Sequence, residues 1–90
     1  MQKAFQVTDE DGIHARPATA LVNAAGKFKA EVIAEACGRR HSMKSILGVL
    51  SFGLAPGDLI TFIAEGEDAE EALAALEEIF AREGLGVVHG

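Results

Sequence analysis

Two hydrophobic patterns divide the chain into short segments. Where apolar and polar residues alternate, the pattern is typical of a strand that buries one face, and where apolar residues recur every three to four positions it is typical of a helix. The first pattern predicts strands at residues 4–8, 27–36, 39–42 and 59–64. The apolar segments between and after them predict helices at residues 17–25, over about two turns after Ser45, and from Asp68 through Phe80 until Gly84 ends the helix.

Residues that favour turns and helix ends stand between these segments. Ser45 and Asp68 are favoured N-cap residues, and Asp68 precedes Glu71 by three positions, as in a capping box. Cys37-Gly38 suits the tight turn of a hairpin. Glycine suits the position after a helix end, and one follows each predicted helix: Gly26, Gly53 and Gly84.

The order of the predicted elements is β-α-β-β-α-β-α. Strands separated by helices, with a hairpin in the middle, predict an α+β fold in which the helices cover one face of a four-stranded antiparallel sheet. A ferredoxin-like sheet remains an alternative, because periodicity does not fix the strand order. Ninety residues are enough for one domain with a single core. The end of the chain, residues 87–90, carries no Asp, Glu, Lys or Arg and is expected to form a flexible tail.

The charge of −6 is unevenly distributed. Residues 65–83 hold eight acidic residues and one basic residue, a net charge of −7, whereas residues 12–57 hold six basic and two acidic residues, a net charge of +4. A basic region on an acidic protein suits phosphate or an acidic protein partner, and the overall balance argues against nucleic acid. The absence of a long apolar run and of a signal-peptide pattern, together with the single Cys37, indicates a soluble cytoplasmic protein without membrane insertion.

The candidate chemistry lies in Gly12-Ile13-His14-Ala15-Arg16-Pro17-Ala18. Gly12 permits a sharp turn, and Pro17 suits the first turn of a helix, where its missing N–H is no loss. His14 is therefore expected beside a helix N-terminus, where free backbone amides and the helix dipole favour anions. Imidazole is a nucleophile that can be neutral near pH 7, and the guanidinium of Arg16 can neutralise added charge. Spacing alone also fits a solvated turn histidine and a surface arginine.

Two motifs in this chain resemble those of HPr, the histidine-containing phosphocarrier of the bacterial phosphotransferase system. The resemblance extends over about residues 5–86 and keeps the order and approximate separation of the two motifs, which implies the open-faced β-sandwich of that family and a domain of residues 1–86. The motifs are Gly12-Ile13-His14-Ala15-Arg16-Pro17-Ala18 and Met43-Lys44-Ser45-Ile46-Leu47-Gly48-Val49-Leu50.

The resemblance implies a phosphocarrier rather than a free-standing enzyme. Nδ1 of His14 would accept a phosphoryl group from enzyme I and pass it to a sugar-specific enzyme IIA component, with Arg16 compensating charge and Pro17 shaping the helix start. No cofactor and no metal are implied, and His14, Cys37, His41 and His89 lack metal-ligand spacing. We expect a monomer.

Ser45 fits two compatible interpretations. It is a good N-cap, and in the HPr proteins of low-GC Gram-positive bacteria the matching serine is regulatory, which implies HPr kinase/phosphorylase and a catabolite-control transcription regulator as partners. Phosphate at an N-cap is tolerated by the helix dipole, and Lys44 is adjacent. The resemblance also implies a partner-binding surface whose residues are Thr19, Lys27, Ile46, Leu47 and Leu50.

Other functions compete with the sugar phosphocarrier. One is a regulatory adaptor that acts through phosphorylated Ser45, although such a protein could dispense with His14. Another is a nitrogen-related phosphocarrier, which the surroundings of Ser45 fit less well. A small hydrolase is remote, because the sequence offers no nucleophile or oxyanion partner for His14 as a base. Residues 37 and 39–41 and Phe52 depart from the usual composition of the family.

Overall fold

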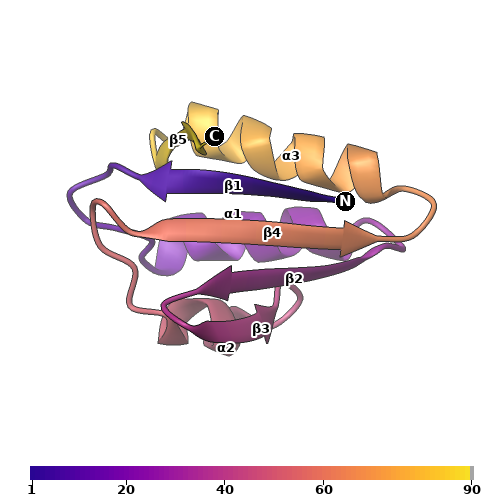
Figure 1. The fold of residues 1–90 in the computed structure, drawn as a ribbon, viewed down its shortest axis with the longest axis horizontal. Coiled ribbons are helices and arrows are strands. Elements are labelled where there is room, and N and C mark those ends of the chain that lie inside the picture. Colours follow the sequence, from indigo (N-terminus) through magenta and orange to yellow (C-terminus); the bar gives the residue numbers. More distant parts are fainter. Residues whose placement is uncertain (90) are drawn as a thin grey trace.

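The computed structural model describes residues 1–89 as one sheet with helices on a single face (Figure 1). The predicted α+β open-faced sandwich is confirmed. The elements in chain order are β1 (Gln2–Val7), α1 (Ala15–Gly26), β2 (Glu31–Ala36), β3 (Arg39–Ser42), α2 (Ile46–Ser51), β4 (Leu59–Glu65), α3 (Ala69–Arg82) and β5 (Gly86–His89). None of these described helices is long and apolar enough to cross a membrane.

All neighbouring strands of the sheet are antiparallel, in the order β3-β2-β4-β1-β5. β4 lies between β1 and β2, whereas in a ferredoxin-like sheet the third strand takes that position. The ferredoxin-like alternative is therefore excluded. The β2–β3 hairpin turns at Cys37 and Gly38, whose φ angles of 53° and 73° are those of a type I′ turn, as the sequence predicts.

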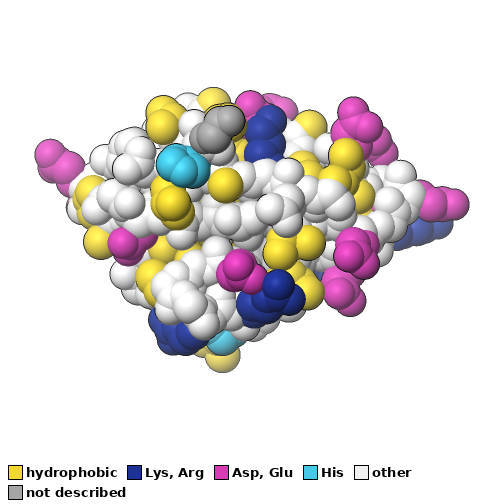
Figure 2. Space-filling model, in the orientation of Figure 1, with side chains coloured by type: hydrophobic (Ala, Val, Ile, Leu, Met, Phe, Trp, Pro, Cys, Tyr) yellow, Lys and Arg dark blue, Asp and Glu magenta, His cyan; other side chains and the backbone are white. Residues whose placement is uncertain are grey.

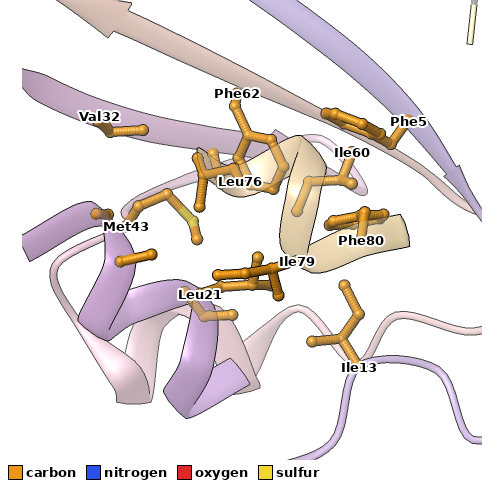
Figure 3. Packing of buried hydrophobic residues seen from close by; sticks show 14 of the residues in the cluster. Phe5, Ile13, Leu21, Val32, Met43, Ile60, Phe62, Leu76, Ile79 and Phe80 are labelled. Carbon is orange, nitrogen blue, oxygen red and sulfur yellow. The ribbon is translucent and has the colours of Figure 1, made fainter. Parts of the chain in front are cut away.

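The core lies between the sheet and the helices. Phe5 of β1 and Phe62 of β4 point to the same face, because the register pairs Phe5 with Ile60 and a strand alternates its side chains. Both rings pack on Phe80 of α3, with centroids 4.6 Å and 5.8 Å from it (Figure 3). On the opposite face of the sheet, hydrophobic side chains are interspersed with polar and charged ones (Figure 2). Only one face of the sheet therefore carries the core.

The sheet has five strands, so the prediction of four strands is wrong by one edge strand. Residues 87–89, expected to be part of a flexible tail, pair with β1 as part of β5, while Gly90 lies outside the described residues. The cause is the turn at the end of α3, where Gly84 has φ +64° and the amide of Leu85 donates to the carbonyl of Phe80. Leu85 is buried there, and this anchor directs the chain back along β1.

The helix and strand boundaries near α1 also differ from the sequence prediction. α1 begins two residues earlier than expected, at Ala15, and continues through Gly26, which has no left-handed conformation. Lys27 is the C-cap and its amide donates to the carbonyls of Ala24 and Ala25. β2 begins only at Glu31, because residues 27–30 form the connection that crosses from α1 to the sheet.

The connection before β2 is held by Asp68, which does not form the predicted capping box. Its side chain makes no bond within α3; instead its carboxylate accepts the amides of Lys29 and Ala30, at 2.9 Å and 2.7 Å. These bonds favour the charged form, so the pKa of Asp68 lies below its ordinary value of 3.8, with the Lys29 amide as the largest cause. The start of α3 is thereby fastened to the start of β2.

Replacing Asp68 by Asn tests this link. Because the folded pKa lies below the unfolded one, the ionised carboxylate adds stability above the unfolded pKa, and this contribution is lost as the pH falls through the folded value. Asp68→Asn should therefore unfold at a lower urea concentration than the wild type near neutral pH, and the difference should shrink below about pH 4. Urea titrations at several pH values measure this. Glu67→Gln removes a neighbouring exposed charge as a control, and equal effects of both variants would contradict the link.

Candidate functional site

His14 lies in the turn that joins β1 to α1. The amide of Gly12 donates to the carbonyl of Asp9 at 2.9 Å, and Gly12 has φ +63°, which reverses the chain direction. Ile13 then enters the core, with 7% of its side chain exposed, and is seen below Phe80 in Figure 3. A buried residue directly before His14 fixes the backbone while the imidazole itself stays in solvent.

The helix N-terminus beside His14 has few free donors. His14 is the N-cap; its carbonyl accepts the amide of Ala18 at 3.0 Å, and its ring makes no capping bond. Ala15 and Arg16 are the first helical residues, so their amides have no partner within the helix. Pro17 is the third helical residue, two positions later than the expected N1 proline, and it is buried. The arrangement can bind an anion through two amides and the helix dipole.

The other predicted site residues on or next to α1 are Arg16, Thr19 and Lys27, and they lie at different distances from His14. Arg16 is exposed next to His14, and no ion pair joins it to a carboxylate within residues 1–89. Thr19 is exposed in the next turn, and its hydroxyl donates to the carbonyl of Ala15 at 2.7 Å. Lys27 follows the last of 12 helical residues, so it lies about 18 Å along the axis from the helix start. The structure brings Arg16 and Thr19 to His14, but not Lys27.

Ser45 is the N-cap of α2, as predicted. Its Oγ accepts the amide of Gly48 at 3.2 Å, and its carbonyl accepts the amide of Val49 at 3.1 Å. Lys44 is not directed to Ser45, because its Nζ donates to the carbonyl of Phe28 at 3.1 Å. Ser45 is therefore an exposed hydroxyl at a short helix, with its neighbouring lysine engaged elsewhere.

α2 presents part of its apolar side chains to solvent. Leu47 is 77% exposed and Leu50 is 37% exposed, whereas Val49 is buried and Ile46 packs partly against the core. We call Ile46, Leu47 and Leu50 the α2 patch. α2 packs on α1, and the turn after β1 lies toward the same end of the molecule (Figure 1).

Residues 39, 41 and 52, which depart from the usual composition of the family, form one cluster at the C-terminal end of α2. Phe52 is buried, with the His41 ring edge-on at 5.0 Å and the Arg39 guanidinium 5.9 Å from its centroid. Arg39 also donates to the carbonyl of Ser51 at 2.7 Å. The hydroxyl of Ser51 donates to the carbonyl of Gly48, so Nε2 of His41 donates to that hydroxyl. Sequence patterns gave no signal for this cluster, which fastens the C-terminal end of α2 to β3.

Fold and site together define a class of protein. An open-faced α+β sandwich displays an unengaged imidazole at a helix N-terminus, with an arginine beside it and an apolar patch on a neighbouring helix. Within residues 1–89, no three His, Cys, Asp or Glu side chains are grouped as metal ligands. This is the arrangement of a small phosphocarrier rather than of an enclosed active site.

Comparison with known proteins identifies the family. The family model of the "PTS HPr component phosphorylation site" matches residues 1–82. A histidine-containing phosphocarrier protein of Mycoplasma is 31% identical over 100% of both chains, with a TM-score of 0.92. HPr of Bacillus anthracis is 42% identical over 88% of this chain and 94% of its own, with a TM-score of 0.80. Crh, a catabolite repression protein of Bacillus subtilis, is 37% identical over 87% of this chain and 90% of its own, with a TM-score of 0.71.

The chain belongs to the HPr family of the phosphotransferase system. It is a phosphocarrier protein and not a free-standing catalyst.

Proposed function

We propose that His14 accepts a phosphoryl group from enzyme I and passes it to a sugar-specific enzyme IIA component. The observation that carries this proposal is the exposed, unbonded ring of His14 at the N-terminus of α1, in a chain of the HPr family. The ring is open to a large protein donor, and the backbone that carries it is anchored by buried Ile13 and Pro17.

The chemistry that this site has to support is in-line phosphoryl transfer. Nδ1 of a neutral His14 ring forms a bond to phosphorus while the bond between phosphorus and its donor breaks. In the second transfer a nucleophile of the acceptor protein forms a bond to phosphorus while the bond between phosphorus and Nδ1 breaks. The transferred group brings negative charge, which Arg16 and the amides of Ala15 and Arg16 are placed to meet. Positioning and charge compensation are sufficient for this reaction.

The partners of the proposed reaction would dock on the α2 patch. Its leucines are exposed, as is Thr19 on α1, and burial of apolar side chains such as these leucines favours association. Lys27 lies a full helix length from His14. We propose that the protein exchanges phosphate as a monomer, although Crh is described as a swapped dimer.

His14→Ala should abolish phosphorylation by enzyme I and phosphoenolpyruvate. The wild type should gain one phosphoryl group, labile in acid and stable in alkali, because a phosphoramidate bond has formed. Intact-mass measurement before and after acid treatment checks both points. His89→Ala removes another exposed imidazole and should react like the wild type. An acid-stable label, or a label that persists in His14→Ala, would show that the acceptor is a different residue.

Arg16→Ala should slow transfer without unfolding the protein. Loss of a charge-assisted contact to the transferred group predicts a fall in kcat/KM of about tenfold to a hundredfold. An exposed arginine outside a network contributes little to stability, so the free energy of unfolding should change by less than about 0.5 kcal/mol. Arg40→Ala, which removes a guanidinium bonded to Glu35, is the control for net charge. A large loss of stability with normal transfer would make Arg16 a structural residue.

Ser45 supports a second, regulatory function. Its hydroxyl is exposed beside the α2 patch, and the similarity to Crh, a protein named for catabolite repression, favours this role. We propose that a kinase, HPr kinase/phosphorylase, modifies Ser45 and that the modified protein binds a catabolite-control transcription regulator. A purely regulatory adaptor would not need His14, so the phosphocarrier remains the first candidate.

Phosphorylation of Ser45 should slow phosphorylation of His14 by weakening docking. The phosphate adds about −1.5 to −2 charges at pH 7 next to Leu47, and a partner that covers this side chain has to desolvate the charge. The fold should persist, because the helix dipole accepts an anion at the N-cap. The initial rate with enzyme I, measured over a range of protein concentrations, should show a raised KM.

Two substitutions separate charge from capping. Ser45→Asp keeps an N-cap acceptor and should reproduce the raised KM more weakly, whereas Ser45→Ala should lose about 1 kcal/mol of stability and leave the KM unchanged. An unchanged rate after phosphorylation, or amide NMR shifts spread across the sheet, would contradict a local docking block.

A further inference from the structure

The turn that carries His14 touches the segment that follows α2 through bare backbone. A Cβ added to Gly12 would fall deep inside the carbonyl oxygen of Leu54 and 3.0 Å from its carbonyl carbon. The contacting atoms are backbone on both sides, so no side-chain rotation could relieve the collision. Gly12 is needed here for close approach as well as for its φ of +63°.

The residues on both sides of this contact are anchored in the core, so a displacement of one segment would also displace the other. On one side Ile13 is buried next to Gly12, and His14 follows directly. On the other side Phe52 and Leu54 are both buried, with 3% and 7% of their side chains exposed, and Phe52 caps the end of α2. Gly53, the single residue between Phe52 and Leu54, is exposed. A buried residue cannot shift without disturbing its neighbours, because protein interiors are closely packed.

Two further backbone hydrogen bonds restrict movement of the segment after α2 away from Gly12. The amide of Val7 donates to the carbonyl of Asp58 at 2.9 Å, and the amide of Gly57 donates to the carbonyl of Val7 at 2.8 Å. The chain after Leu54 is therefore tied to the end of β1, while the chain before it ends α2. Leu54 can move away from Gly12 mainly by carrying the C-terminal end of α2 with it.

We propose that Gly12 is a positioning residue, whose missing Cβ sets the distance between His14 and the α2 patch. A protein donor has to cover the patch and reach the ring at the same time, so its rate depends on that distance. This inference rests on the proposed function. In it, the Gly12–Leu54 contact keeps His14 and the α2 patch at a fixed distance from each other. A misplacement of about 1 Å is enough to cost a factor of about a hundred in a transfer reaction.

Gly12→Ala tests the proposal against two matched controls. Gly53→Ala and Gly84→Ala place the same side chain on the same left-handed backbone, with φ of +63° and +64°, but their Cβ atoms meet nothing within 4 Å. Each variant is phosphorylated by enzyme I and, separately, by the small donor phosphoramidate, which needs His14 but no docking surface. Amide NMR shifts of residues 46–50 report on α2 without any donor.

Gly12→Ala should lose about tenfold to a hundredfold in kcat/KM with enzyme I, mainly through KM, and react normally with phosphoramidate. Both controls should stay within about threefold of the wild type, and only Gly12→Ala should shift the amides of residues 46–50. Equal enzyme I rates in Gly12→Ala and Gly53→Ala, an equal slowing with both donors, or unmoved α2 amides would each overturn the proposal. If enzyme I fails with the wild type while phosphoramidate labels His14, the proposed function fails, and the NMR comparison still decides the role of Gly12.

A variant without a collision covers the case in which Gly12→Ala does not fold. One glycine inserted between Gly53 and Leu54 lengthens an exposed point of the loop, which costs little closure entropy. It should slow enzyme I and leave phosphoramidate unaffected, because α2 is no longer held to the turn at a fixed distance. A normal rate with enzyme I in this variant would overturn the proposal.

Discussion

The burial of one face of the sheet is the constraint on which the rest of the structure depends. Five antiparallel strands place Phe5 and Phe62 on the face that α1 and α3 cover, and Phe80 of α3 closes the same cluster. An antiparallel sheet tolerates solvent on its other face, so no second layer of helices is needed. In a chain of ninety residues this concentrates the available apolar surface into one core.

A one-sided core also determines where chemistry can lie. Helices and strands are used for burial, and within residues 1–89 no buried side-chain nitrogen or oxygen lacks a partner. The exposed His14 and Ser45 are instead N-caps, at the points where the chain leaves the sheet and enters a helix. Buried Ile13 directly precedes His14, and buried Met43 stands two residues before Ser45, so both sites combine an open side chain with a fixed backbone.

Local patterns in the sequence predicted what depends on neighbouring residues. The Cys37-Gly38 turn, the Ser45 cap and the alternation of buried positions could all be read in this way, because each interaction spans a few residues. β5 could not, since four residues without a strong pattern become a strand only through pairing with β1. The bonds of Asp68 to the chain before β2 and the contact of Gly12 with Leu54 join residues about forty positions apart, and no spacing rule connects them.

The composition of the helix start fits a carrier that has to release what it accepts. An anion at a helix N-terminus is usually met by several free amides, but here Pro17 removes the donor of the third helical residue and is itself buried. Two amides, one exposed arginine and a screened dipole contribution of about 0.3–1 kcal/mol remain. Tighter binding of the phosphorylated state would lower the free energy of the intermediate and raise the barrier to its next transfer. For the carrier role that we propose, a weak and exposed phosphate site on a rigid backbone is therefore an advantage, because speed comes from position rather than from affinity.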